Sequence, residues 1–325
     1  MDKKFLIIDS RPYGLFSIFL HTIDNIKWAQ DNGYIPVVRW NPGRRDPNRG
    51  RVDRNNFLTE NTPPSFNNTP GYKHCQCLYW NKDGWNGSKN PWEYYFQRLN
   101  SYTVEDATRQ DFDISDIFMI GKSDNDIGNK FLIADIDRYE PLMLWNILGT
   151  DLEHKNRVEV SEVINNNVKI KPNIMKKIDN FHSKHFNKDV LAVHVRGTDK
   201  KLEYPHKALP LQAYLDAIRE YLNTNPKSKI YVASDNNEAI TTIIKEFGRE
   251  KTIVYNAIRM NKYISKDPIC LTPATGPKHG EECLIEATLL SKCKHLICTD
   301  SNVAAGALYM NPNLTVTYLN RMYGK

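Results

Sequence analysis

Short apolar runs alternate with amphipathic stretches throughout the second half of the chain, and this alternation constrains the fold more than any other feature. Runs rich in β-branched residues predict strands, and stretches with apolar residues at helical spacing predict helices. The predicted strands are residues 189–195, 229–234, 252–255, 295–299 and 315–319. The predicted helices lie near residues 209–224, 236–247, 280–293 and 302–310. Strands that alternate with helices indicate an α/β fold with a parallel sheet covered on both faces.

The first half of the chain begins in the same way. A strand over residues 5–9 is followed by a helical pattern from Leu15 to about Asp31, which Asn32-Gly33 ends. A second strand follows at residues 35–40, a short one is expected at 117–120, and a helix over about 172–186 leads into the second half.

A chain of 325 residues is long enough for two domains. We therefore expect two Rossmann-like domains facing each other across a cleft. The N-terminal domain would span residues 1–170 and carry a long insertion at 41–90, which is rich in Asn, Pro, Gly and Arg. The C-terminal domain would span residues 171–325.

Composition excludes several classes of protein. The net charge of +6 is mild and the basic residues form no stripe, so a nucleic-acid partner is not expected. No stretch approaches the roughly 18 apolar residues of a membrane span, and the apolar part of the N-terminus is too short for a signal peptide. The six cysteines are therefore expected to be reduced thiols. Moderate basicity suits a small acidic ligand.

The end of the strand at 189–195 carries the strongest chemical signal. The apolar run leads directly into His194, Arg196, Thr198, Asp199 and Lys200. In open α/β sheets, ligands bind beyond the carboxyl ends of the strands. Because a guanidinium presents a planar fork of donors suited to phosphate oxygens, Arg196 predicts an anion site, in particular for a diphosphate. The alternative for Arg196 is a salt bridge between domains.

This segment, His-Val-Arg-Gly-Thr-Asp-Lys, resembles the His-x-Arg-Arg-Thr-Asp-Lys motif of the α-1,6-fucosyltransferases and nodulation fucosyltransferases. Four further segments resemble the family in the same order: Pro12-Tyr-Gly14, Pro91 to Phe96, Lys229 to Asp235, and Glu286 through Cys298-Thr-Asp-Ser-Asn302. The resemblance implies a GT-B fold and a GDP-fucose donor. Gly197 departs from the pattern, because it stands where the family has a second arginine.

The resemblance also implies a donor-binding set. It comprises Tyr13, Gly14, His194, Arg196, Asp235, Glu286, Thr299, Ser301 and Asn302. Glu286 would pair with the guanine N–H groups, and the alternative is an ordinary position on the protein surface. His194 would contact guanine or its ribose, and the alternative is a core histidine whose hydrogen bonds are satisfied within the protein. Ser301 and Asn302 open a helix of small residues, whose N-terminus either binds phosphate or is simply capped.

Catalysis needs a base for the acceptor hydroxyl and positive charge for the leaving diphosphate. Glu203 lies just past Lys200, where the similar enzymes place a catalytic glutamate, although one residue must be gapped to align it. Asp199 is the second candidate for the catalytic base. The alternative is that Asp199 only orders the turn in which it is expected to lie. Arg196 and Lys200 would neutralise the phosphates, and Lys200 could instead pair with the catalytic acid. Exposed loop positions are the alternatives for Lys200 and Glu203.

On the acceptor side, we assign Trp92 and Glu93, although aromatic clusters of this kind often serve packing. No metal is expected. Asp124-Asn-Asp126 and Asp135-Ile-Asp137 match a short Asp-x-Asp pattern that turn chemistry also explains. His74-Cys75-Gln-Cys77 lacks a second ligand pair at zinc spacing.

The sequence thus predicts an inverting, metal-independent glycosyltransferase that moves fucose from GDP-fucose to a hydroxyl of an oligosaccharide or glycoconjugate in polysaccharide biosynthesis. The animal enzymes carry a membrane anchor, a coiled-coil stem and an SH3-like domain, and we expect no counterpart of these segments in this chain. This favours a cytoplasmic enzyme of a microbial or viral type. Peripheral association with a membrane is left open. Two alternatives remain. One is a GT-B transferase for another GDP- or UDP-sugar, and the other is a non-catalytic module that binds glycans or nucleotides.

Overall fold

The structure is a computed structural model that describes residues 3–9, 14–40, 90–109, 111–114, 144–186, 189–197, 209–259 and 276–320. The chain divides into two compact units. The first contains Met1–Lys171 and Leu271–Gly280, and the second contains Pro172–Cys270 and Glu281–Lys325. The segment 271–280, which the sequence analysis assigned to the C-terminal domain, thus groups with the first unit.

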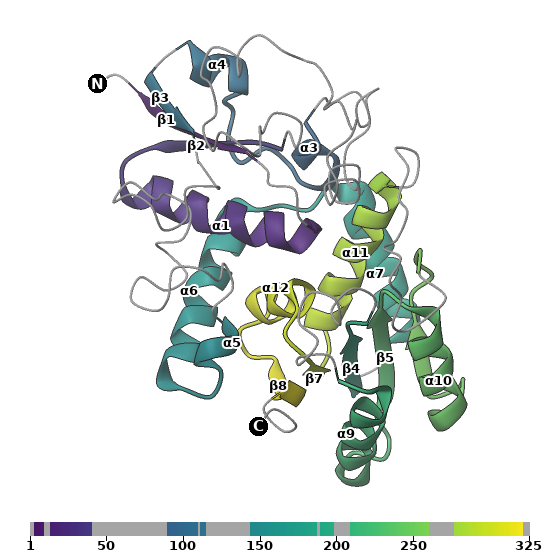
Figure 1. Ribbon diagram of the computed structural model, residues 1–325. Helices are drawn as coiled ribbons and strands as arrows, with labels where there is room; N and C mark the ends of the chain where they lie inside the picture. Colours follow the sequence, from purple (N-terminus) through teal and green to yellow (C-terminus); the bar gives the residue numbers. More distant parts are fainter. Residues whose placement is uncertain are drawn as a thin grey trace, which may run out of the picture. The chain divides into compact units, whose positions relative to one another are not determined.

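The first unit is built on a parallel sheet of three strands. Strand β1 (Lys4–Asp9) lies between β2 (Ile35–Arg39) and β3 (Asp111–Ile114). Helix α1 (Leu15–Asp31) connects β1 to β2 in a βαβ unit (Figure 1). The strand–helix–strand start of the chain is therefore confirmed. The strand expected at 117–120 lies outside the described residues, and β3 comes a few residues earlier.

Gly33 ends helix α1 for a stereochemical reason. Its φ of 75° is in the left-handed region that residues with a Cβ rarely adopt. In this conformation, the Gly33 N–H donates to the Gln30 carbonyl (3.3 Å) and the Tyr34 N–H donates to the Ala29 carbonyl (2.8 Å). These two bonds form a Schellman motif, which satisfies carbonyls that the last turn would otherwise leave open.

Four further helices complete the described part of the first unit. They are α3 (Trp92–Tyr95), α4 (Val104–Thr108), α5 (Leu144–Ile147) and α6 (Asp151–Asn167). Phe96 forms an antiparallel bridge with Ile170, which joins the segment after α3 to the segment after α6. The long insertion predicted at 41–90 lies outside the described residues, apart from Asn90.

The second unit contains a parallel sheet of five strands in the order β6-β5-β4-β7-β8. The strands are β4 (Val190–Val195), β5 (Lys229–Ser234), β6 (Thr252–Val254), β7 (His295–Cys298) and β8 (Thr315–Tyr318). With β4 as the first strand, this is the Rossmann order, in which the chain leaves the central strand in one direction and returns on its other side. All five predicted strands are confirmed, each to within about one residue.

Helices cover both faces of this sheet, as predicted. They are α7 (Pro172–His185), α9 (Leu211–Thr224), α10 (Asn237–Phe247), α11 (Gly276–Ser291) and α12 (Asn302–Met310). On one face, apolar side chains of β4 and β5 form a core with α9 and α10 (Figure 1). On the other, Phe181 and Phe186, at the end of α7, lie 6.3 Å and 5.1 Å from the Tyr231 ring of β5. No helix within the described ranges is both long and apolar enough to cross a bilayer.

The strand order identifies where a ligand would bind in this unit. Strands β5 and β6 extend the sheet to one side of β4, and β7 and β8 extend it to the other. The connections therefore leave the carboxyl ends of β4 and β7 in opposite directions, and in doubly wound sheets this switch point is where ligands bind. Two units with parallel sheets confirm the α/β class and give the domain composition expected of a GT-B chain.

Candidate nucleotide site at the carboxyl edge of the second sheet

The charged residues that follow β4 and β5 meet at the carboxyl edge of the sheet. Because Val195 pairs with Ser234 across the two strands, the next residue of each strand lies at the same level. Arg196 Nη1 donates to Asp235 Oδ2 over 2.5 Å, and the Gly197 N–H donates to Asp235 Oδ1 over 3.2 Å. Asp235 thus fixes both the arginine and the turn after β4. The ion pair with Asp235 lies within the second unit.

The Arg196 side chain keeps 28 % of its surface exposed, while that of Asp235 keeps 14 %. A guanidinium at the carboxyl end of a strand offers several donors that suit an anion. The geometry therefore fits the predicted diphosphate contact.

His194 is buried in the sheet just before this edge. Only 5 % of the residue is exposed. Burial lowers the pKa of its imidazole to about 4; nearby Asp235 raises the pKa and Arg196 lowers it. His194 is therefore neutral at physiological pH. Its Nδ1 has no hydrogen-bond partner within the part of the chain that the structure describes.

Glu286 lies on α11 and is buried, so a surface position, one of the two interpretations, is wrong. Its side chain is 11 % exposed and accepts a hydrogen bond from Arg259, whose side chain is 3 % exposed. Burial raises the pKa of the carboxyl to about 8, although the Arg259 guanidinium lowers it. Asp235 also raises this pKa, so the Asp235 and Glu286 carboxylates lie within electrostatic reach of each other.

Cys283, one turn before Glu286, shows that these groups converge. Burial raises the pKa of its thiol to about 12. Glu286 and Asp235 add to this increase and Arg196 opposes it. Arg196, Asp235 and Glu286 thus lie within electrostatic reach of the Cys283 thiol, and Arg259 and Glu282 lie within reach of Glu286.

Arg259 is a site residue that the sequence analysis missed. It follows β6, in the segment 255–259, and contacts an acid 27 positions further along the chain. The rule that singled out Arg196, a cation just beyond the carboxyl end of a predicted strand, applies to Arg259 as well. It could have been found in this way.

The loop after β7 lies at the same carboxyl edge. Ser301 is the N-cap of α12 and accepts from the Val303 N–H (3.3 Å), and Asn302 is the first residue of the helix. Thr299 is 2 % exposed and its hydroxyl lies 3.2 Å from the Tyr214 hydroxyl of α9. The Thr299 side chain is thus used for packing against α9. The N-terminus of α12 lies at the crevice edge, where an anion would be stabilised.

Several predicted residues cannot be placed. Tyr13, Asp199, Lys200 and Glu203 lie outside the described residues, as do the Asp-x-Asp segments and the His-Cys cluster. Gly14 is the N-cap of α1 in the first unit, and its carbonyl accepts from the Ser17 and Ile18 amides at 2.9 Å and 3.1 Å. Within the described ranges, no group of three or more His, Cys, Asp or Glu side chains could hold a metal ion.

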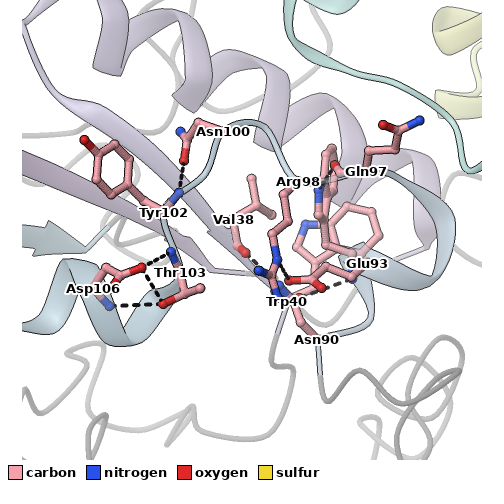
Figure 2. Close-up of polar contacts among 11 residues, drawn as sticks. Val38, Trp40, Asn90, Glu93, Gln97, Arg98, Asn100, Tyr102, Thr103 and Asp106 are labelled. Atoms are coloured by element: carbon pink, nitrogen blue, oxygen red, sulfur yellow. Dashed lines mark hydrogen bonds and ion pairs between the residues drawn. The ribbon is translucent and has the colours of Figure 1, made fainter.

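Trp92 and Glu93 lie on α3 in the first unit. Trp92 is 1 % exposed, and its rings lie 5.1 Å from Trp40 and 4.3 Å from Phe96. Glu93 forms a salt bridge with Arg98 (2.8 Å). Figure 2 shows this region, in which Asn90 binds the Val38 carbonyl and the Trp40 amide. Trp92 is thus a packing residue, the alternative that the sequence left open, and the acceptor role of Glu93 stays a prediction.

The comparisons with known proteins give structural likenesses only. Neither a scan against protein-family models nor a search of curated proteins finds a match. Among solved structures, the chain is similar to NodZ alpha-1,6-fucosyltransferase soaked with GDP-fucose, with a TM-score of 0.48 and 14 % identity over 95 % of this chain and 94 % of that chain.

Two further solved structures are similar. The fucosyltransferase NodZ from Bradyrhizobium gives a TM-score of 0.47 and 15 % identity over 95 % and 92 % of the two chains. POFUT1 in complex with GDP-fucose gives a TM-score of 0.46 and 11 % identity over 98 % of each chain.

Proposed function

We propose that the protein is an inverting glycosyltransferase that takes fucose from GDP-fucose and transfers it to a glycan hydroxyl. The observation that carries this proposal is Arg196, which follows β4 at the switch point of a Rossmann-type sheet, where the neighbouring strand β7 leads into α12. A guanidinium and a helix N-terminus both stabilise phosphate oxygens. The motifs that resemble fucosyltransferases coincide with these positions.

The reaction would be one displacement at the anomeric carbon. The acceptor hydroxyl oxygen forms a bond to this carbon while the bond to the diphosphate oxygen breaks, and the electron pair leaves with GDP. Arg196 and Lys200 would stabilise the charge that develops on GDP, because fixed donors aimed at developing charge lower the barrier. Glu203, or Asp199 as the second candidate, would take the hydroxyl proton.

The remaining residues would bind the donor. Glu286 and His194 would contact the guanosine, and Ser301 and Asn302 would direct helix amides to the phosphates. Asp235 would hold Arg196 in place. The other predicted contacts with donor and acceptor are Tyr13, Gly14, Thr299 and Glu93.

Metal independence is part of the proposal. Two cationic side chains and a helix N-terminus supply the charge that a divalent cation supplies in metal-dependent enzymes. The setting we propose is polysaccharide biosynthesis in the cytoplasm.

The test is transfer of fucose by the variant Arg196→Ala. Since loss of one donor to a developing oxyanion typically costs a factor of about 10² to 10³ in rate, we expect transfer to fall by at least about 100-fold. The fold should stay intact, as followed by circular dichroism. The matched control is Arg219→Ala, which removes an exposed arginine paired with Asp216 and Glu246 on α9 and α10. Near-normal turnover by Arg196→Ala would refute the assignment.

Gly197 favours a second candidate, a transferase that uses another nucleotide sugar. With only one arginine after β4, the diphosphate contact is retained but the family's second guanidinium is absent. Thermal shifts with GDP, UDP and their sugars separate the two candidates, because only the preferred donor should give the largest stabilisation at equal concentration.

A further inference from the structure

The proposed function needs the Glu286 carboxylate to bind the guanine of the donor. In the structure, this carboxylate is in a buried contact with Arg259. Arg259 Nη2 donates to Glu286 Oε1 and to the Tyr255 carbonyl (2.8 Å), and Nη1 donates to the Ala257 carbonyl (2.8 Å). The guanidinium is thus held between Glu286 and the backbone of its own segment. In this state, a carboxylate oxygen of Glu286 is already occupied.

The segment 255–259 contains no helix or strand and is attached to α11 at two points. Glu282 Oε2 accepts from the Ile258 N–H (2.7 Å), and Glu286 accepts from Arg259. The two acids are four residues apart and therefore lie on one side of the helix. Few contacts need to break for Arg259 to leave Glu286.

Polar atoms around this contact are buried without partners. Within the described ranges, Arg259 Nε, Tyr231 Oη and His194 Nδ1 make no hydrogen bond. Because Tyr231 pairs with Ala192 and Ala233 pairs with His194 in a parallel ladder, Tyr231 and His194 lie on the same face of the sheet. Glu286 raises the pKa of Tyr231, which places both near one another. Buried polar groups without partners are costly, so a ligand that supplied hydrogen-bond partners beside this contact would relieve that cost.

We propose that Arg259 competes with guanine for Glu286. Arg259 holds Glu286 in the free protein and leaves it when guanine binds. This inference rests on the proposed function. The N1–H and N2–H groups of guanine flank one carbon, as two N–H groups of a guanidinium do, so both offer adjacent donors to a carboxylate. Uracil has a single N–H between two carbonyls. Uracil therefore cannot replace both donors of Arg259 at Glu286. The need to displace Arg259 thus makes the site select guanine nucleotides over uracil nucleotides.

The test compares the full chain with the variant Arg259→Met, which keeps a flexible, unbranched side chain and removes the guanidinium donors. Calorimetric titration with GDP and UDP measures both affinities. A binding-competent state that is only partly populated weakens apparent affinity, so removing the competitor should tighten GDP binding. We expect at least a tenfold lower Kd for GDP and an unchanged Kd for UDP. The matched control Arg219→Met should leave both unchanged.

Every outcome decides the proposal. Tighter GDP binding by Arg259→Met than by the parent chain supports the proposal. This includes the case in which only the variant binds GDP measurably. Weaker or equal GDP binding overturns it, because Arg259 would then contact the ligand or be uninvolved, while the proposed function stands. If neither chain binds GDP, both proposals fail.

Amide hydrogen exchange of the unaltered protein is a second test of the proposal, and it does not depend on whether the variant folds. The Ile258 amide is protected by Glu282 in the free protein. Displacement of Arg259 should make this amide exchange faster when GDP is bound, although ligands usually slow exchange. Slower exchange of the 255–259 amides with GDP would overturn the proposal.

Discussion

The carboxyl edge of β4 and β5 and the segment around Trp92 both contain residues that the sequence singled out, but they satisfy their polar groups differently. Around Trp92, buried polar groups bond to the protein itself: Asn90 binds Val38 and Trp40, and the Trp92 indole donates to the Gln97 carbonyl at 3.0 Å. At the carboxyl edge, His194 and Arg259 each have a buried nitrogen without a partner in the described ranges. In the described ranges, the named polar groups around Trp92 thus have protein partners, whereas these two buried nitrogens do not.

The difference shows that residue type is a poor guide to a binding site. Tryptophan near a glutamate is typical of sugar-binding sites and also of cores. Burial and hydrogen-bond satisfaction distinguish the two cases, and neither can be read from the sequence.

The largest effect is expected for Trp92→Ala, which tests whether the first region is core. Removing a buried tryptophan costs about 3 to 5 kcal/mol of stability, because the transfer free energy is lost and a cavity remains. Chemical denaturation measures the free energy of unfolding. Trp92→Phe, which keeps a ring, should cost less. Wild-type stability of Trp92→Ala would show that Trp92 is not a packing residue.

A somewhat smaller effect should appear in the pH dependence of stability, and it arises in the second region. The folded pKa of His194, about 4, is below its ordinary value of 6.5. Between these values, His194 binds more protons in the unfolded state, so its own contribution to stability falls as the pH falls from about 6.5 to 4, whereas the raised pKa of Glu286 contributes with the opposite sign. At 1.36 kcal/mol per unit, the loss is on the order of 3 kcal/mol.

His194→Gln should reduce this acid slope, measured by denaturation at several pH values. Contributions of both signs should remain in this variant, because burial lowers the pKa of His295 and raises the pKa of Glu286. His295→Gln is the matched control, since it should leave the contribution of His194 in place. An unchanged slope in His194→Gln would mean that His194 is not buried in its neutral form.

The smallest effect concerns the capping box of α4, which Figure 2 shows next to the Trp92 region. The Thr103 hydroxyl accepts from the Asp106 N–H (3.1 Å), and the Asp106 carboxylate accepts from the Thr103 N–H (2.9 Å). Thr103→Ala should cost about 1 kcal/mol, measured by denaturation, with GDP affinity unchanged. Thr103→Ser, which keeps the hydroxyl, should cost less. A change in GDP affinity would contradict the view that this region is independent of the donor site.

Much of the second unit could be predicted because its signals are local. The strand at 189–195 contains the apolar run Val190-Leu-Ala-Val193, and Ser301 precedes a stretch rich in small apolar residues that forms α12. Strand β3 was missed because Asp111-Phe-Asp-Ile114 is short and half acidic, and its pairing with β1 depends on residues far away in the sequence.

The site was predictable only in part, for the same reason. Arg196, Asp235 and Glu286 were found from strand ends and motif resemblance. The pairing of Arg259 with Glu286 was not, because no periodicity links residues from an irregular segment and a helix. Whether an arginine contacts a ligand or an acid is decided by tertiary packing.

The central claim is that Arg196 binds the diphosphate of a guanine nucleotide, and titration calorimetry with GDP and guanosine tests it most directly. The parent chain and Arg196→Ala would each be titrated with both ligands. The account predicts that the substitution weakens GDP binding by at least tenfold and leaves guanosine binding unchanged, since only GDP carries the phosphates. Equal affinity of both chains for GDP, or an equal loss for both ligands, would contradict it.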